Sequence, residues 1–294
     1  MNPLVSICIP TFNGASFIED ALNSALAQTY KNIEIVVSDD ASNDTTLQIV
    51  KNYQDITTIP IRVYQHQPNC IGSNWNHCIK HAQGEYIKFL FQDDVLMPKC
   101  IEKMIAVLNQ KPQCALVACK RQFITEAGMD SPEIDKWKTI YGDLQVHLNM
   151  ASESGQLILS KKLFSHPLFY ASPFNKIGEP SVVMFRKSIL GKTGYFREDL
   201  KQILDYEYWY RILKQYPIAI ITEPLVKFRL HESQATNLNR NKTINDYKIY
   251  ENLLYNDYFW LLHPMLRKRL FNKYHIIPRG YKRIKQFIKT KILN

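Results

Sequence analysis

The chain has 294 residues, 46% of them hydrophobic, and a formal net charge of +10, which indicates a globular protein with a sizeable buried core. Its six cysteines stand singly without the paired spacing of a metal site, no apolar run is long enough to cross a bilayer, and the first residues do not resemble a secretion signal. These features exclude a cysteine-based zinc module and a membrane-spanning helix, and we expect a cytoplasmic protein with reduced cysteines.

The first third of the chain alternates between predicted strands and helices. Apolar runs predict strands near residues 5–10, 34–38, 60–65 and 86–91, and apolar residues at helical spacing predict helices near 17–28, 45–53, 73–82 and 98–108. Short links between alternating strands and helices indicate a parallel, doubly wound α/β sheet.

The middle of the chain is less regular. We expect strands near residues 114–119, 181–185, 219–222 and 226–230, an apolar helix near 157–164 and an aromatic-rich helix over 205–213. The rest of the stretch 126–172 has no clear period, and the carboxyl-terminal part is expected to be helical.

Two acidic pairs are the most informative feature. Asp39 and Asp40 follow the second predicted strand, and Asp93 and Asp94 follow the fourth. A single pair at a strand end is more often turn or helix-cap chemistry. Two pairs of like charges at the edge where open α/β sheets bind ligands instead favour a cation or a ligand's hydrogen-bond donors between them. The repetition therefore predicts metal and nucleotide chemistry.

Six further patterns occur in a fixed order: VSICIPTFN at residues 5–13, SALAQTY at 24–30, DDASNDT at 39–45, GEY at 84–86 leading to the acidic pair, DYEYWYR at 205–211 and FRLH at 228–231. Together they resemble the motifs of family 2 glycosyltransferases, over about residues 4–235. The resemblance implies the GT-A fold, a mostly parallel central sheet flanked by helices. It also implies an enzyme of polysaccharide or glycoconjugate biosynthesis that moves a sugar from a nucleotide-diphosphate sugar to a hydroxyl of a glycan or lipid-linked acceptor, with inversion.

The same resemblance divides the chain. Residues 1–238 correspond to the glycosyltransferase domain, with a nucleotide-binding half at 1–110 and an acceptor-binding half at 111–238. Residues 239–294 remain as a helical, basic carboxyl-terminal extension.

By resemblance, the nucleotide site comprises Asp40, which accepts a base N–H, and the turn formed by Pro10, Thr11, Phe12 and Asn13. Considered without the family, the same residues form a strand-end turn with a helix cap.

The second acidic pair matches the family's metal-binding motif. We assign Asp94 to a Mn²⁺ or Mg²⁺ ion, Asp93 to the ribose or the metal, and His231 to the metal shell or the diphosphate. An isolated histidine is more often structural, and only its Arg-Leu-His context supports a role here. Relatives carry a further Asp where this chain has Phe91, so the metal would rest on fewer carboxylates.

Asp205 matches the family's catalytic base, although relatives have an acid where this chain has Leu204. Its position at a helix start is expected to favour the ionised carboxylate, because the amino-terminal end of a helix dipole is positive. Considered alone, Asp205 is more often a helix cap. Glu207 is the alternative base.

Glu179, Pro180 and Trp209 are expected to line the sugar or acceptor pocket, although residues 178–181 alone read as an ordinary loop. Many relatives have an arginine where this chain has Trp75, so donor binding is expected to rest on the metal and on Lys88 or Arg186.

The positive charge is concentrated at the carboxyl end. From Arg267 onward there are ten basic residues and no acidic one, which leaves 27 Lys and Arg against 27 Asp and Glu elsewhere. Tyr281, Ile284, Ile288 and Ile292 recur at helical spacing, a pattern typical of a basic amphipathic helix. We expect residues 267–294 to bind an anionic membrane surface, so that the protein lies peripherally on the inner face. The alternative is a helix packed on the body; no recognition motif supports nucleic acid.

Two function classes remain open: a metal-dependent glycosyltransferase, and a nucleotide-sugar-binding relative without transfer activity. Asp40, Asp93, Asp94 and Asp205 favour the first, because a protein that only binds would not need a base. A nucleotidyltransferase is expected to have a basic, glycine-rich loop after the first strand. Residues 13–16 contain no basic residue, which speaks against this third class.

Overall fold

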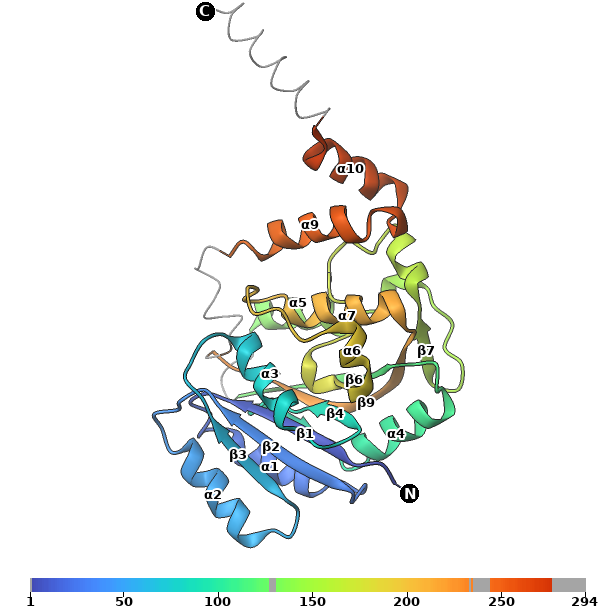
Figure 1. The fold of residues 1–294 in the computed structure, drawn as a ribbon. Coiled ribbons are helices and arrows are strands. Elements are labelled where there is room, and N and C mark those ends of the chain that lie inside the picture. The colour runs from blue at the N-terminus through green and yellow to red at the C-terminus, as the bar shows by residue number, and fades with distance from the viewer. Residues whose placement is uncertain (1, 127–130, 233, 235–243, 277–294) are drawn as a thin grey trace, which may run out of the picture.

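One mixed β-sheet organises the molecule (Figure 1). The computed structural model describes residues 2–126, 131–232, 234 and 244–276. The strands follow the order β3-β2-β1-β4-β8-β6-β9-β5, and β7 pairs with β9 beside this path. The predicted α/β fold is confirmed.

The amino-terminal half is parallel, as predicted. Its strands are β1 (Val5–Thr11), β2 (Ile33–Asp39), β3 (Ile61–Gln65) and β4 (Tyr86–Phe89). The helices between and after them are α1 (Ile18–Leu26), α2 (Thr46–Ile56), α3 (Ile71–His81) and α4 (Cys100–Gln110). Since the strand order reverses between β1 and β4, a ligand crevice is expected where the carboxyl ends of these two strands diverge.

The second half of the sheet is mixed rather than parallel. Its strands are β5 (Val95–Leu96), β6 (Leu116–Thr125), β7 (Gln156–Leu159), β8 (Val183–Arg186) and β9 (Ile218–Leu230). β8 lies antiparallel between β4 and β6, whereas β6 and β9 are parallel with a register shift on either side of Lys120.

Two predicted elements of this half are wrong. The apolar stretch 157–164 is not a helix: its first residues form β7, which pairs with β9, and η2 (Lys161–Ser165) is a short 3₁₀ turn. The two short strands predicted at 219–222 and 226–230 are one continuous strand, β9, because Pro224 is accommodated at the irregular register with β6.

The remaining helices follow β6 along the chain, with α9 and α10 above α7 in Figure 1. They are α5 (Pro132–Tyr141), α6 (Leu190–Thr193), α7 (Leu204–Gln215), α9 (Asp246–Asp257) and α10 (Pro264–Tyr274). Short 3₁₀ turns connect them: η1 (Val146–Leu148), η3 (Pro180–Val182), η4 (Lys187–Ile189) and η5 (Phe259–Leu261).

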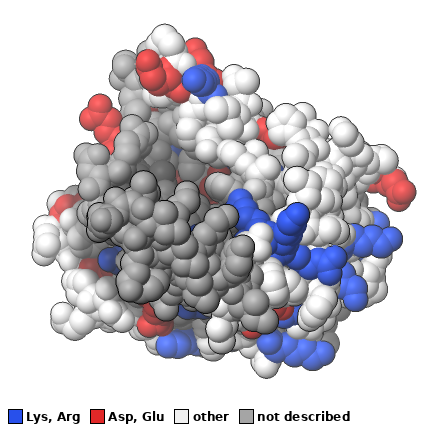
Figure 2. All heavy atoms as spheres, turned by 90° about the horizontal axis from the view of Figure 1, so that it is seen from above, with Lys and Arg blue, Asp and Glu red and all other residues white. Residues whose placement is uncertain are grey.

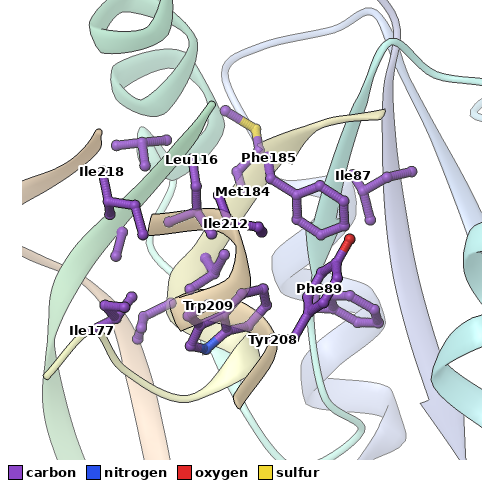
Figure 3. Packing of buried hydrophobic residues seen from close by; sticks show 14 of the residues in the cluster. Ile87, Phe89, Leu116, Ile177, Met184, Phe185, Tyr208, Trp209, Ile212 and Ile218 are labelled. Carbon is purple, nitrogen blue, oxygen red and sulfur yellow. The ribbon is translucent and has the colours of Figure 1, made fainter. Parts of the chain in front are cut away.

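The core beneath α7 joins the two halves of the sheet (Figure 3). Tyr208 and Trp209 of α7 are fully buried, and the ring of Phe185 on β8 lies 6.0 Å from Tyr208 and 6.3 Å from Trp209 between ring centroids. Large aromatic surfaces of this kind dominate the burial energy of a core. This packing fixes α7, and with it Asp205, against the sheet.

The carboxyl-terminal extension is partly built into the body. Leu254 of α9 is fully buried, and the Tyr250 ring lies 5.3 Å from the ring of Tyr206 on α7 between centroids. α10 follows and buries Leu270. The stripe predicted at 281–292 lies outside the described residues. Within the helices that are described, none combines the length and apolar character needed to span a membrane.

Candidate active site

The first acidic pair divides into a structural and an available carboxylate. Asp39, at the end of β2, is buried; its Oδ2 accepts a 3.0 Å hydrogen bond from Thr11 Oγ1, and its Oδ1 accepts one of 2.9 Å from the Ser42 amide. Asp40 is half-buried, and its Oδ1 has no hydrogen-bond partner in the described part of the chain. The predicted nucleotide carboxylate, Asp40, is therefore the more exposed member of this pair.

His66, just after β3, is a neighbour of Asp40 that the sequence did not indicate. Its Nε2 lies 3.5 Å from Asp40 Oδ1 and 3.3 Å from Asn74 Oδ1. Burial raises the pKa of Asp40, and His66 opposes that shift. His66 thus helps hold the Asp40 side chain in position.

The predicted turn after β1 is only partly available to a ligand. Pro10 and Thr11 are buried within β1, so their side chains cannot line a nucleotide pocket as expected. Phe12 is 51% exposed, and Asn13 has a φ of 49°, which turns the chain away from the sheet. The exposed ring of Phe12 is the surface on which a nucleotide base can pack.

Gln92, which the sequence analysis passed over, ties this turn to the second acidic pair. Its Oε1 accepts a 2.9 Å hydrogen bond from the Phe12 amide, and its Nε2 donates one of 3.1 Å to the Phe12 carbonyl. Gly14 permits this approach, because a Cβ there would lie 2.3 Å from Gln92 Oε1. The ends of β1 and β4 are thereby held together.

The second pair also divides, into a buried carboxylate and a more accessible one. Asp94 is 1% exposed, and its Oδ1 accepts a 3.0 Å hydrogen bond from the Arg229 amide. Burial, and then the charge of Asp93, raise the pKa of Asp94. The Asp93 side chain is 19% exposed, and its Oδ2 lies 2.9 Å from His231 Nε2. Asp94 Oδ2 has no hydrogen-bond partner in the described part of the chain, so Asp94 as a metal ligand stays a prediction, and Asp93 is the more accessible carboxylate of the pair.

The end of β9 closes over this pair. Arg229 donates from Nε to the Asp93 carbonyl at 2.9 Å and pairs with Asp20 of α1 at 2.8 Å. The ring of Phe17 lies 4.7 Å from that of His231 between centroids. Asp93 and His231 supply an oxygen and a nitrogen donor, which suit a divalent cation that also takes phosphate oxygens. No cluster of three or more His, Cys, Asp or Glu suited to a metal occurs among the described residues.

Trp75 and Phe91, the two residues that depart from the family pattern, are in contact. The ring of Trp75 lies 5.1 Å from that of Phe91 between centroids, and Phe196 packs on Trp75 at the same distance. An aromatic cluster therefore stands where relatives carry an arginine and an aspartate. The proposed substitutes for the arginine are wrong: Lys88 is fully buried and bonded to the Ser181 carbonyl, and Arg186 is bonded to the Leu108 carbonyl at 2.7 Å.

Asp205 lies in the first turn of α7. Its Oδ2 accepts a 2.8 Å hydrogen bond from Asn175 Nδ2. Burial raises the pKa of Asp205 to about 7, and hydrogen bonding by the Tyr206 amide acts in the opposite direction. The helix start favours the ionised carboxylate as expected, since the Tyr206 amide lowers the pKa, but desolvation is the larger effect and raises it.

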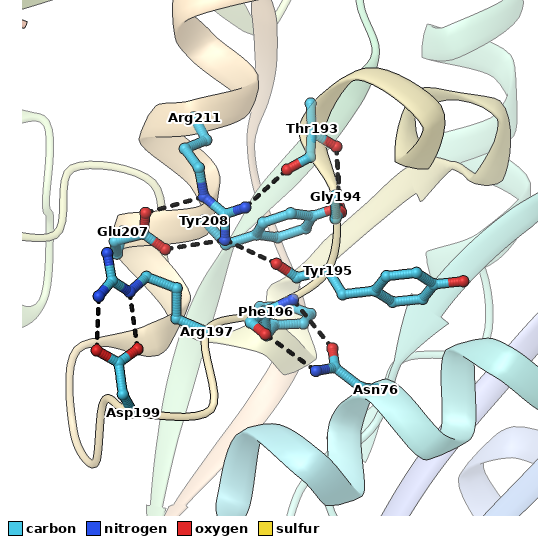
Figure 4. A network of polar contacts seen from close by, with 10 residues as sticks. All are labelled: Asn76, Thr193, Gly194, Tyr195, Phe196, Arg197, Asp199, Glu207, Tyr208 and Arg211. Atoms are coloured by element: carbon cyan, nitrogen blue, oxygen red, sulfur yellow. Dashed lines mark hydrogen bonds and ion pairs between the residues drawn. The ribbon is translucent and has the colours of Figure 1, made fainter. Parts of the chain in front are cut away.

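The contacts of Glu207 do not favour it as the alternative base. It is buried and pairs with Arg211 Nε at 2.8 Å, within a network in which Arg211 also donates to the Thr193 carbonyl at 2.7 Å and the Tyr195 carbonyl at 2.8 Å (Figure 4). The glutamate is occupied in holding the turn after α6.

The expected pocket residues separate in the same way. Trp209 is fully buried and its Nε1 donates to the Gly178 carbonyl at 3.0 Å, and Pro180 is also buried. Their place in a sugar or acceptor pocket stays a prediction that their burial does not support. The Glu179 side chain is 23% exposed and pairs with Arg121 at 2.9 Å. Its charge adds to burial in raising the pKa of both Asp205 and Asp94. Glu179 therefore stands close to both acidic centres and connects the two halves of the site.

Asp246, the first residue of α9, holds the loop that leads into α7. Its Oδ2 accepts hydrogen bonds from three successive backbone amides, those of Lys201 at 2.9 Å, Gln202 at 2.7 Å and Ile203 at 3.2 Å. The residue is 2% exposed. The extension expected to be separate thus supports the segment just before Asp205.

Gln92 directly precedes the acidic pair, and that adjacency was the only signal that could have found it. Asn175, Arg121 and Asp246 gave none, because each reaches the site over a long stretch of chain.

Comparison with known proteins shows the family of the chain. The family model for glycosyl transferase family 2 matches residues 6–166. An uncharacterized glycosyltransferase of Rickettsia typhi is 33% identical over 242 residues, covering 82% of this chain and 68% of the relative. One from Rickettsia prowazekii is 32% identical over 253 residues, covering 86% and 70%.

Solved structures of lower identity share the fold. S. aureus TarS 1–349, in complex with UDP-GlcNAc, superposes with a TM-score of 0.65 at 19% identity, covering 92% of this chain and 71% of that one. This chain spans 42% of a longer TarS structure. The mannosyltransferase PcManGT of Pyrobaculum calidifontis, in complex with GDP-Man and Mn²⁺, gives 0.58 at 18% identity, covering 93% and 75%. The sequence matches establish that this chain belongs to glycosyl transferase family 2.

Proposed function

We propose that this family 2 glycosyltransferase moves a sugar from a nucleotide-diphosphate sugar to a hydroxyl of a glycan or lipid-linked acceptor, with a divalent cation and with inversion at the anomeric carbon. One observation carries the proposal: the loop 175–181 is bonded to both centres, since Asn175 Nδ2 donates to Asp205 Oδ2 at 2.8 Å and Ser181 Oγ accepts the Phe91 amide, just before the acidic pair, at 2.9 Å. A donor-side acidic centre and a basic carboxylate therefore flank one site, as a transfer reaction requires.

The nucleotide half rests on Phe12 and Asp40. The exposed Phe12 ring offers a packing surface for a base, and the half-buried Asp40 carboxylate would accept a base N–H. TarS in complex with UDP-GlcNAc and PcManGT in complex with GDP-Man support the donor class for this chain.

The cation site is assigned to Asp93 and His231, with Mn²⁺ or Mg²⁺ as the ion. When bound, the ion would neutralise charge on the departing diphosphate. Asp94 is the residue behind it: its buried carboxylate fixes the Arg229 amide, and Arg229 in turn holds the Asp93 carbonyl. The PcManGT complex with Mn²⁺ supports a metal in this chain.

Asp205 is the proposed base. With its Oδ2 held by Asn175, the carboxylate accepts the proton of the acceptor hydroxyl as that oxygen attacks the anomeric carbon and the nucleoside diphosphate leaves. A pKa of about 7 suits a general base at neutral pH, since such groups work best near the operating pH. Attack from the face opposite the leaving group inverts the anomeric configuration.

Thermal stability against UDP-, GDP-, dTDP- and CDP-sugars, with and without Mn²⁺ or Mg²⁺, tests the donor and the metal together. A donor at a hundredfold its dissociation constant stabilises the fold by ~2.7 kcal/mol. We expect a shift with one nucleotide that requires the cation. A donor that binds without any subsequent release of nucleoside diphosphate, with every acceptor tried, would favour the binding-only alternative. A folded protein that no donor stabilises would contradict the proposal.

A further inference from the structure

The end of the described chain carries an unusual density of exposed apolar side chains. Twelve large hydrophobic residues are exposed in the described part of the protein, and four of them fall between residues 260 and 276. They are Trp260 at 83%, Met265 at 76%, Phe271 at 37% and Ile276 at 83%. Single exposed hydrophobic residues need no explanation, but a cluster of this kind marks an interaction surface.

The packing of α10 explains why these side chains face outward. Leu270 is fully buried, and Leu266 and Tyr274, one turn before and after it, pack partly against the core. This stripe holds the helix to the body. Phe271 lies instead over a shallow hollow of about 280 Å³, which is lined by Phe259, Pro264, Arg267, Lys268 and Phe271. We call the outer surface made by residues 259–276 the α10 face.

The cations of the α10 face differ in their partners. Arg269 pairs with Glu251 at 2.5 Å, and Lys273 also pairs with Glu251. No carboxylate among the described residues pairs with Arg267 or Lys268, and the Arg267 guanidinium lies 5.9 Å from the centroid of the Trp260 ring. Figure 2, which looks down on the molecule from above, shows several Lys and Arg side chains close together on the right, and others elsewhere on this face. Arg267 therefore stands beside the exposed Trp260 ring, and Lys268 lines the same hollow as Arg267.

This combination favours an anionic lipid surface over a second copy of the chain. A symmetric dimer through the α10 face would bring like charges together, because both partners present the same surface. The sequence has ten basic and no acidic residues from Arg267 onward, so the chain offers no countercharge there. Tryptophan with basic residues is the composition of segments that lie in the headgroup region of a bilayer.

We propose that the α10 face docks on an anionic phospholipid bilayer, with Trp260, Met265, Phe271 and Ile276 entering the headgroup boundary and Arg267 and Lys268 contacting lipid phosphates. The proposal goes beyond the expected basic tail, because it places the apolar anchor in η5 and α10 and starts it at Trp260. It is also separate from transfer: binding to lipid needs neither donor nor acceptor.

The test is co-sedimentation of the full chain with phosphatidylcholine vesicles that contain roughly a third phosphatidylglycerol, compared with pure phosphatidylcholine. We expect binding to the anionic vesicles that weakens as salt rises from ~0.1 M to ~1 M, over which the screening length falls from ~10 Å to ~3 Å. Trp260→Ser with Met265→Ser should weaken binding about tenfold through lost apolar insertion. Arg267→Gln and Lys268→Gln should each weaken it about fivefold.

Matched controls remove the same chemistry elsewhere. Ile56→Ser takes away a side chain that is 79% exposed on α2, and Lys51→Gln with Lys99→Gln removes two exposed charges. These variants should bind vesicles as the wild type does, and every variant should keep the wild-type melting temperature.

Three outcomes would overturn the proposal. The first is equal binding to neutral and anionic vesicles. The second is undiminished binding after Trp260→Ser with Met265→Ser, which would place the lipid contact elsewhere. The third is a concentration-dependent dimer in sedimentation that the same pair of substitutions abolishes, with no vesicle binding, which would make the α10 face a protein interface.

Discussion

Asn175 Nδ2 donates a 2.8 Å hydrogen bond to Asp205, 30 residues further along the chain. The side-chain oxygen of Asn175, Oδ1, accepts hydrogen bonds from the backbone amides of Ile177 and Gly178 at 2.9 Å each. An amide fixed on both sides can hold a carboxylate in one orientation. Asp205 is therefore positioned by the loop that also carries Glu179. Together with burial, the charge of Glu179 raises the pKa of both Asp205 and Asp94.

The rate of transfer should depend on the protonation of Asp205. Its pKa is about 7, so the fraction of ionised base, and with it the rate, should fall as pH falls through that value. Asn175→Ala removes a hydrogen bond that lowers the pKa, so the acid limb of the pH–rate profile should move upward. Measuring nucleoside diphosphate release from pH 5 to 9 checks both statements. An acid limb near pH 4 in the wild type would contradict this account.

Asp205 should also make stability depend on pH. Because its folded pKa lies above the ordinary value of 3.8, the folded state binds the proton more tightly, and the contribution of Asp205 to stability declines as pH rises from about 4 to about 7. Asp205→Asn removes that penalty, so at pH 8 the variant should be more stable than the wild type by ~1–3 kcal/mol. Denaturant unfolding at pH 4 and pH 8 provides the comparison. A variant that is less stable at pH 8 would show that the burial penalty is absent.

Binding of the metal should depend more on Asp93 and His231 than on Asp94. Asp93→Ala or His231→Ala should abolish the Mn²⁺-dependent part of donor stabilisation. Asp94→Asn keeps an oxygen for the Arg229 amide and should retain most of it, because Asp94 is only 1% exposed. Donor titrations followed by calorimetry, with and without the cation, distinguish the two carboxylates. The opposite pattern would restore Asp94 as the principal ligand.

Asp246 should affect the active site through the loop before α7. Asp246→Ala leaves three backbone amides without their acceptor, and buried unsatisfied donors cost about 1–3 kcal/mol each when water cannot reach them. We expect lower stability, slower transfer and an acid limb displaced toward lower pH, since a loosened loop admits water to Asp205. Asp246→Asn keeps the side-chain shape and an acceptor oxygen, so its stability, its transfer rate and the position of its acid limb should change less than in Asp246→Ala. A loss of stability with an unchanged pH profile would make Asp246 purely structural.

Trp75 and Phe91 should behave as a coupled pair. Phe91→Asp places a carboxylate beside Trp75 and Phe89 and should be destabilising by ~1–3 kcal/mol, whereas Trp75→Arg with Phe91→Asp restores the family's charged pair and should recover part of that loss. A double-mutant cycle measured by thermal unfolding gives the coupling. Additive effects would show that the two departures are independent.

The sequence predicts the amino-terminal half well because its signals are local. Buried parallel strands give continuous apolar runs, as in β2, and helices begin and end near the residues that the spacing indicates. The prediction of a helix at 157–164 is wrong because a short apolar run is compatible with either a helix or a strand. Pairing with β9 stabilises the strand.

The site shows the same limit. The residues Asp40, Asp93, Asp205 and His231 could be named from motifs. Which member of each acidic pair is accessible could not, because that depends on partners far along the chain, such as Thr11 for Asp39 and Arg229 for Asp94. Trp209 illustrates the difference: it lies in a motif, yet it packs in the core.

The most direct test of the central claim compares wild type with Asp205→Asn, using the nucleotide sugar that stabilises the protein. Donor affinity is measured by calorimetry and turnover by release of nucleoside diphosphate, with water or an added glycan as acceptor. We predict that the variant binds the donor as tightly as the wild type and turns it over ~10²–10⁴-fold more slowly, the usual contribution of a general base. Equal turnover in the two proteins would contradict the assignment of Asp205 as the catalytic base.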